Sequence, residues 1–107
     1  MKLRIEDNSL RLRLSEAEVQ QFAEAGRVAA VLPLGPADTD ALTYALERVE
    51  TEHFRVSYGA GAITVKVPAT LAAHWTSTDQ NGLSATLLLT DTQSLKVLIE
   101  KDLDCRH

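Results

Sequence analysis

Residues 2–14 read KLRIEDNSLRLRL, in which leucine or isoleucine alternates with lysine or arginine on both sides of a short polar segment. Alternation with a period of two is typical of a half-buried β-strand. Asn8 tolerates the left-handed backbone conformation of a tight turn, so the pattern predicts a β-hairpin that turns at Asp7-Asn8. Pairing Ile5 with Leu10 buries the apolar residues on one face, and a slip of one residue would expose them to water.

The same register brings cations together on the other face of this hairpin. Arg4 then lies opposite Arg11, and Lys2 lies opposite Arg13. Like charges directly opposite one another destabilise a strand pair, so the arrangement calls for a compensating partner.

A second hairpin repeats the arrangement in FRVSYGAGAITVKV (residues 54–67). Pairing Tyr58 with Ile63 places Arg55 opposite Lys66. The two hairpins together hold six of the eleven lysine and arginine residues of the chain. They form our candidate site for an anion or an acidic partner, which consists of Lys2, Arg4, Arg11, Arg13, Arg55 and Lys66.

Two interpretations of these cations follow from the sequence. Arginines in pairs suit bidentate contacts with oxyanions, which favours a binding site. Alternatively, the cations form a solvated face that acidic residues of neighbouring strands neutralise, and long cationic side chains also protect edge strands from pairing. The acidic residues available for this role are Glu47, Glu50, Glu100 and Asp102.

The sequence pattern predicts that the secondary-structure elements follow the order strand-strand-helix-strand-strand and that this order occurs twice along the chain. Ser15 and Glu18 have the form of a capping box and Gly26 is placed to end a helix, so we expect the first helix over residues 16–25. Segment 41–50 fits a strand or a helix, and its alternating apolar residues favour a strand. Further strands are expected at 27–34, 54–58 and 63–67 and in a hairpin over 83–102, with a short helix starting at Pro68.

The two halves of the chain also match in their letters. SLRLRLSEAEVQQF (residues 9–22) aligns with AITVKVPATLAAHW (residues 62–75) at a spacing of 53 residues. Such self-similarity suggests two related halves, 1–50 and 51–107, within one domain that spans the chain. We therefore expect an α+β fold, mainly antiparallel, whose pseudo-two-fold halves form a barrel or two packed sheets with two short helices. The aromatic residues expected in the core are Phe22, Phe54, Tyr58 and Trp75.

Composition limits the class of protein. Of the 107 residues, 45% are hydrophobic and 24% are charged, which is ordinary for a soluble globular chain. A net charge of -4 counts against general affinity for nucleic acid. One cysteine excludes an intrachain disulfide, and no apolar run approaches the length of a membrane span. We therefore expect a cytoplasmic protein without a membrane partner.

Chemistry-bearing motifs are sparse. GAGA (residues 59–62) lacks the lysine and the strand-to-helix context of a phosphate loop and is interpreted as a turn. The C-terminal segment offers weak metal candidates in Asp104, Cys105 and His107, since one such group without a second ligand pair is more often a plain tail. No spacing indicates a catalytic triad. We expect no cofactor and no catalytic residue, so a non-enzymatic protein is favoured.

Several segments in order resemble a known family over nearly the whole chain. These are KLRIEDNSLRLRLSEAEV, LTYALE, ITVKVP and LIEKDLDC. Together they are similar to a family of small uncharacterised bacterial proteins classed as a domain of unknown function. The resemblance implies a bacterial cytoplasmic protein and implies nothing about activity.

A second, local resemblance covers residues 5–25. NSLRLRLSEAEVQQF resembles the strand and helix that open AbrB-like and MazE-like swapped-hairpin DNA-binding domains. Asn8-Ser9 match that pattern, whereas Asp7 stands in place of its glycine and Ser15 in place of its proline. The resemblance implies a nucleic-acid-binding regulator, with Arg4, Arg11 and Arg13 as the residues concerned.

The sequence thus leaves three functions open. The first is a small binding or interaction protein, with a homodimer among its expected assemblies. The second is the nucleic-acid-binding regulator of swapped-hairpin type. The third is a metal-binding protein or enzyme that uses the C-terminal aspartate, cysteine and histidine.

Overall fold

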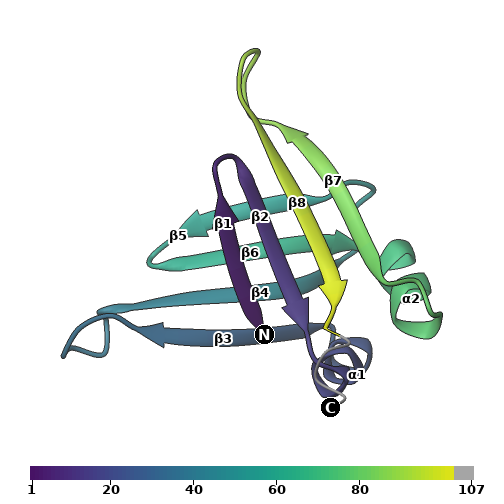
Figure 1. Cartoon of the computed structure of the whole chain (residues 1–107), viewed down its shortest axis with the longest axis horizontal. Helices are drawn as coiled ribbons and strands as arrows, with labels where there is room; N and C mark the ends of the chain where they lie inside the picture. Colours follow the sequence, from purple (N-terminus) through teal and green to yellow (C-terminus); the bar gives the residue numbers. More distant parts are fainter. Residues whose placement is uncertain (103–107) are drawn as a thin grey trace.

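The computed structural model describes residues 1–102 and shows eight strands and two helices there, in the predicted order (Figure 1). The elements are β1 (Lys2–Glu6), β2 (Ser9–Leu14), α1 (Glu16–Ala25), β3 (Arg27–Pro33), β4 (Ala41–Val49), β5 (Arg55–Gly59), β6 (Ala62–Pro68), α2 (Ala69–Ser77), β7 (Gly82–Leu88) and β8 (Ser94–Lys101).

The strands form two four-stranded sheets. Sheet A has the order β1-β2-β8-β7, and sheet B has the order β3-β4-β6-β5. Each sheet therefore joins a hairpin of the first half to a hairpin of the second half, and its two central strands run parallel. The strands of sheet A cross in front of those of sheet B (Figure 1). The expected two packed sheets are confirmed, whereas the alternative of a closed barrel is wrong.

Parallel pairing at the centre of each sheet departs from the expected antiparallel fold. The four hairpin pairings are antiparallel, but β2 pairs with β8 and β4 pairs with β6 in parallel. Alternating apolar residues specify which face of a strand is buried and do not specify its neighbour. The expectation of antiparallel neighbours failed at these two junctions for that reason.

The hairpin registers are confirmed. Ile5 pairs with Leu10 in the first hairpin, and Tyr58 pairs with Ile63 in the second. Each turn contains a non-glycine residue with positive φ, and the value is 51° at both Asp7 and Ala60. Segment 41–50 is a strand, as expected, and forms β4.

Helix α1 has the predicted boundaries because both ends are capped. The Ser15 hydroxyl accepts from the Glu18 backbone N–H, and the Glu18 carboxylate accepts from the Ser15 backbone N–H. Gly26 ends the helix at φ 76°, a left-handed conformation that favours glycine. The helix buries Val19 and Phe22 against the sheets.

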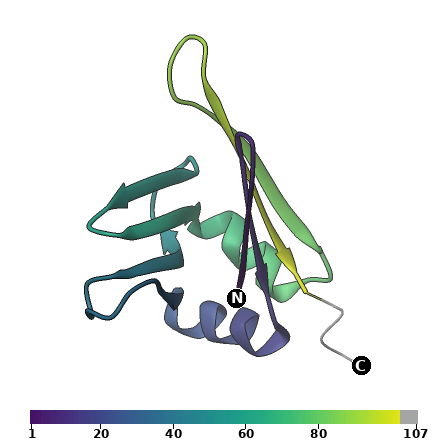
Figure 2. The same ribbon diagram turned by 60° about the vertical axis from the view of Figure 1, so that its left-hand side comes forward.

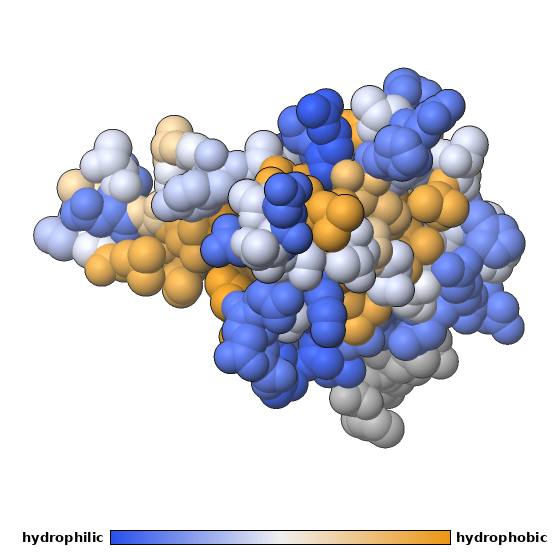
Figure 3. Space-filling model, turned by 90° about the horizontal axis from the view of Figure 1, so that it is seen from above, coloured by the Kyte–Doolittle hydropathy of each residue, from blue (hydrophilic) through white to orange (hydrophobic). Residues whose placement is uncertain are grey.

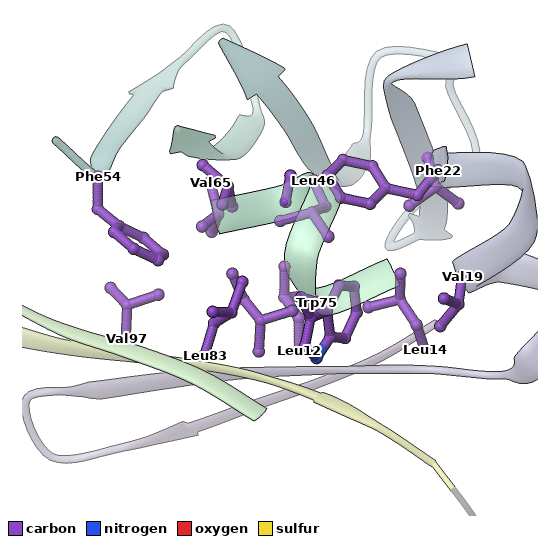
Figure 4. Close-up of a cluster of buried hydrophobic side chains, with 14 of the residues drawn as sticks. Leu12, Leu14, Val19, Phe22, Leu46, Phe54, Val65, Trp75, Leu83 and Val97 are labelled. Carbon is purple, nitrogen blue, oxygen red and sulfur yellow. The ribbon is translucent and has the colours of Figure 1, made fainter. Parts of the chain in front are cut away.

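Buried apolar side chains from both sheets and both helices meet in one cluster (Figure 4). Trp75 of α2 is fully buried, and its indole N–H donates to the Asn81 carbonyl at 3.0 Å. Its ring contacts that of Phe22 edge to face, with centroids 6.2 Å apart. Phe54 is also buried, so three of the four aromatic residues expected in the core lie there.

The prediction that Tyr58 lies in the core is wrong, because 76% of the residue is exposed. Ile5, predicted on the buried apolar face of the first hairpin, is 62% exposed. Both side chains lie on the core-facing side of their strands, as their register partners Ile63 and Leu10 show. However, the two hairpins extend past the facing sheet, so their turn ends remain uncovered (Figures 1 and 2).

Candidate anion-binding surface

The cations of the first hairpin face each other as predicted. Arg4 is in register with Arg11, and Lys2 is in register with Arg13. On its other side β2 pairs with β8, which places Glu100 directly beside Arg13. The outer face of sheet A therefore brings an acidic residue to this row of cations.

Glu100 compensates two arginines at once. Its Oε1 atom lies 2.6 Å from Nε of Arg13 and 3.6 Å from Nε of Arg11. The Nε atom of Arg11 is buried and makes no hydrogen bond within residues 1–102, so the carboxylate is its electrostatic partner. The Glu100 side chain is only 13% exposed, which limits screening by water.

The other two cations of this hairpin also have acidic neighbours. Lys2 Nζ lies 2.7 Å from Oδ2 of Asp102, whose side chain is buried. Arg4 pairs with Glu6 on its own strand at 3.3 Å, and both side chains are largely exposed. Among the acids named from the sequence, Glu100 and Asp102 therefore take the flanking role in the first hairpin.

The second hairpin differs in this respect. Arg55 is in register with Lys66, which is in register with Glu47 on β4. The Glu47 carboxylate, however, pairs with Arg27 at 3.5 Å. No ion pair within residues 1–102 involves Arg55 or Lys66, so these two cations remain without an acidic partner in the part of the chain that the structure describes.

A further charged group was missed by the sequence reasoning. The N-terminal ammonium of Met1 pairs with Oε2 of Glu18 at 2.5 Å, and the Tyr44 hydroxyl donates to the Met1 carbonyl. Burial alone would raise the pKa of Glu18, but hydrogen bonds from the ammonium and from Ser15 outweigh it and hold the pKa below its ordinary value. This cluster fixes β1 to α1 and β4.

A cavity of about 660 Å³ lies where the start of α1 meets the end of α2 and of β8. Its charged lining comprises three acids and one lysine, Glu16, Asp79, Asp102 and Lys101. Lys101 Nζ donates to the Thr78 carbonyl and lies 5.5 Å from the centre of the Trp75 ring. The cavity is therefore acidic, does not extend the cationic surface and was not predicted from the sequence.

The structure does not test the C-terminal metal candidates. Asp104, Cys105 and His107 lie outside the described residues. Within residues 1–102, no group of three or more histidine, cysteine, aspartate or glutamate side chains is placed to hold a metal ion. The same part of the chain contains no helix that is long and apolar enough to cross a membrane.

Comparison with known proteins identifies the family and leaves the activity open. Neither the curated proteins nor the solved structures contain a significant match to this chain. The model of a family of unknown function, DUF7009, matches residues 1–107. The chain therefore belongs to the DUF7009 family.

Proposed function

We propose that this protein is a non-enzymatic binding protein that takes an extended acidic segment of a partner protein along strand β5. The observation that carries the proposal is the pair formed by Arg55 and Lys66, which have no acidic partner within the described residues. In the first hairpin, by contrast, each cation has an acid within 4 Å. A cytoplasmic, bacterial setting is part of the proposal, in keeping with the single cysteine of the chain.

The position of β5 supports an extended partner. Within residues 1–102, β5 is an edge strand of sheet B and pairs only with β6, which leaves its outer backbone groups free of strand pairing there and able to pair with an added strand. Ser57 and Gly59 alternate with Arg55 on its outer face, and a Cβ atom added at Gly59 would meet nothing within 4 Å. Small residues there leave room for a segment whose carboxylates reach Arg55 and Lys66.

The outer face of sheet B carries a net positive charge although the chain is acidic overall. Arg27, Glu47, Lys66 and Arg55 follow one another across its four strands, so three cations accompany one carboxylate. Opposite charge attracts an acidic segment and raises its rate of association. Nucleic acid is a less favoured partner. The swapped-hairpin resemblance assigns DNA binding in part to Arg11 and Arg13 on β2, and Glu100 already pairs with both arginines.

We also propose that the chain contains two related halves. Positions 53 residues apart carry matching features, namely the positive-φ residues Asp7 and Ala60 and the acids Glu47 and Glu100 near the C-terminal ends of central strands β4 and β8. The strand order of one sheet becomes that of the other when each element is replaced by its counterpart in the other half. These correspondences support a duplication of the strand-strand-helix-strand-strand unit.

The binding proposal is tested with a labelled peptide of about ten residues that alternates glutamate and valine, titrated with protein by fluorescence anisotropy. The double variant Arg55→Glu, Lys66→Glu should bind at least about tenfold more weakly than wild type. A matched control, Arg4→Glu with Lys96→Glu, reverses two exposed cations of sheet A and changes the net charge by the same amount. Its loss of affinity for the peptide measures the effect of net charge alone and should be no more than about twofold.

Two outcomes would overturn this proposal. One is undetectable binding of the peptide by wild type at low salt. The other is an equal loss in both double variants, which would show that net charge alone governs binding. A duplex DNA probe measured beside the peptide separates the alternative, since tighter binding of DNA than of peptide would favour the nucleic-acid regulator.

A further inference from the structure

The turn between β5 and β6 determines which backbone groups of β5 point outward. Both central residues of this turn have positive φ, 51° at Ala60 and 75° at Gly61, as in a two-residue turn of type I′. The Gly61 carbonyl accepts from the backbone N–H of Thr43 on β4 at 2.9 Å. Because successive residues of a strand direct their backbone groups to opposite sides, Ala62 directs its groups towards Gly59 on β5.

The backbone groups of β5 therefore alternate between β6 and the free edge. Arg55, Ser57 and Gly59 direct their N–H and C=O groups towards β6, whereas Val56 and Tyr58 direct theirs outward. Within residues 1–102 no other strand pairs with this edge. Each of the two outward residues offers one donor and one acceptor, so the edge can pair with a short extended segment.

Val56 and Tyr58 also place their side chains on the face of sheet B that continues the core. Their register partners are Val65, which is buried, and Ile63, which packs against the core. Tyr58 itself is 76% exposed, and Arg55 lies on the opposite, cationic face. Seen from above, apolar side chains border hydrophilic ones at the left end of the molecule (Figure 3). A strand added to β5 would therefore have one face beside Tyr58 and the other beside Arg55.

We propose that this edge selects, among acidic segments, those in which acidic residues alternate with apolar residues. The inference rests on the proposed function and names the pattern that the bound segment must have. The acidic side chains lie beside Arg55 on the outer face, and the apolar residues between them contact Tyr58 on the other face. Aromatic and β-branched side chains on directly opposite residues of neighbouring strands attract each other. The backbone of the same segment forms hydrogen bonds with Val56 and Tyr58.

The selectivity is tested with two labelled peptides of about ten residues and equal charge, one alternating glutamate with valine and one alternating glutamate with serine. Wild type should bind the valine peptide at least about fivefold more tightly in fluorescence anisotropy. Tyr58→Thr keeps a residue that suits a strand and should reduce this preference at least about threefold. Val31→Thr is the matched control, because Val31 is 61% exposed on β3, the other edge of sheet B, and it should keep the preference.

Methylation of peptide nitrogens tests the backbone contacts separately. In an antiparallel added strand, the residues opposite Val56 and Tyr58 are the valines, and their N–H groups donate to β5. N-methylation of every valine should weaken binding at least about tenfold, whereas N-methylation of every glutamate should change it by less than about threefold. The reverse dependence would place the segment parallel to β5 and would equally support pairing at this edge.

Circular dichroism and thermal unfolding confirm that each variant is folded. The inference is overturned if wild type binds the valine and serine peptides equally, or if Val31→Thr loses the preference as strongly as Tyr58→Thr does. Equal effects of methylation at valine and at glutamate also overturn it. If Arg55→Glu, Lys66→Glu still weakens binding of the valine peptide in these cases, the proposed function stands and this inference alone fails. If that double variant binds like wild type, both fail.

Discussion

The Nε atom of Arg13 lies 2.6 Å from Oε1 of Glu100, although 87 positions separate the two residues. The contact spans the parallel junction between β2 and β8 at the centre of sheet A. The same carboxylate oxygen also lies 3.6 Å from Nε of Arg11. One residue of the second half thus compensates the repulsion between cations that the first hairpin brings together.

Replacing Glu100 with glutamine should destabilise the protein. The change keeps the shape of the side chain but leaves Arg11 and Arg13 without their common counter-charge in a site that is largely shielded from water. We expect the free energy of unfolding to fall by about 1–3 kcal/mol, between the values for surface and buried ion pairs. Urea denaturation at pH 7 measures it.

Glu47→Gln provides the matched control for that loss. Glu47 occupies the corresponding place in sheet B, but its partner Arg27 is more than half exposed and lies 3.5 Å away. An exposed pair of this kind contributes less than about 1 kcal/mol. Equal losses in the two variants would contradict the architectural role assigned to Glu100.

The stability of the fold should depend on pH through Glu18. Hydrogen bonds from the N-terminal ammonium and from Ser15 outweigh the effect of burial and lower the pKa of this carboxyl from 4.5. A carboxyl with a lowered pKa stabilises the fold above its unfolded pKa, and this contribution is lost as the pH falls through its folded pKa. The free energy of unfolding of wild type should therefore exceed that of Glu18→Gln by about 1–2 kcal/mol at pH 7.

The difference between wild type and Glu18→Gln should shrink as the pH falls below the unfolded pKa and through the lowered folded pKa, because the carboxyl is then protonated in both states. Urea denaturation of both proteins across this range measures it. Acetylating the Met1 amine of wild type removes the ammonium and should cause a similar loss at pH 7. A difference that stays constant with pH would contradict the assignment.

Substitution of Gly26 should show how strongly the end of α1 is fixed. Its φ of 76° is left-handed, and a Cβ there would lie 3.0 Å from the Arg48 guanidinium. Gly26→Ala should lower the free energy of unfolding by about 1–2 kcal/mol. Thermal and urea unfolding measure the change.

Gly59→Ala is the control for Gly26→Ala. Gly59 has ordinary negative φ, and an added Cβ there would touch nothing within 4 Å. Alanine reduces the entropy of the unfolded chain, so this variant should be neutral or more stable by up to about 1 kcal/mol. Equal destabilisation by the two variants would mean that backbone conformation at Gly26 is not the cause.

Local features of the fold were predictable from the sequence. The period of two fixed both hairpin registers, because one slip would have moved every apolar side chain to the solvent. The capping residues Ser15, Glu18 and Gly26 gave both ends of α1. These features depend on residues close together in the chain, and their physical rules need no knowledge of distant neighbours.

Distant relationships were not predictable in the same way. Nothing in the sequence around Arg13 indicates that β8 pairs beside it. Glu100 could therefore be named only as one of several acidic residues available to neutralise the cations. Tyr58 follows the apolar period, yet the period cannot reveal where the facing sheet ends. The exposure of Tyr58 is a consequence of how the two sheets cross. Arg55 and Lys66 have no acidic partner within residues 1–102 because the neighbouring Glu47 pairs with Arg27 instead.

The parallel junction between β2 and β8 also has a kinetic consequence. It joins Ser9–Leu14 to Ser94–Lys101, so sheet A closes only after most of the chain has been brought together. Closing so long a loop slows folding, and a β-rich topology of this kind folds in about milliseconds to seconds. During synthesis, the apolar face of β2 remains without its partner strand β8 until about eighty more residues have left the ribosome. This is the interval in which a chaperone would protect the exposed apolar surface from aggregation.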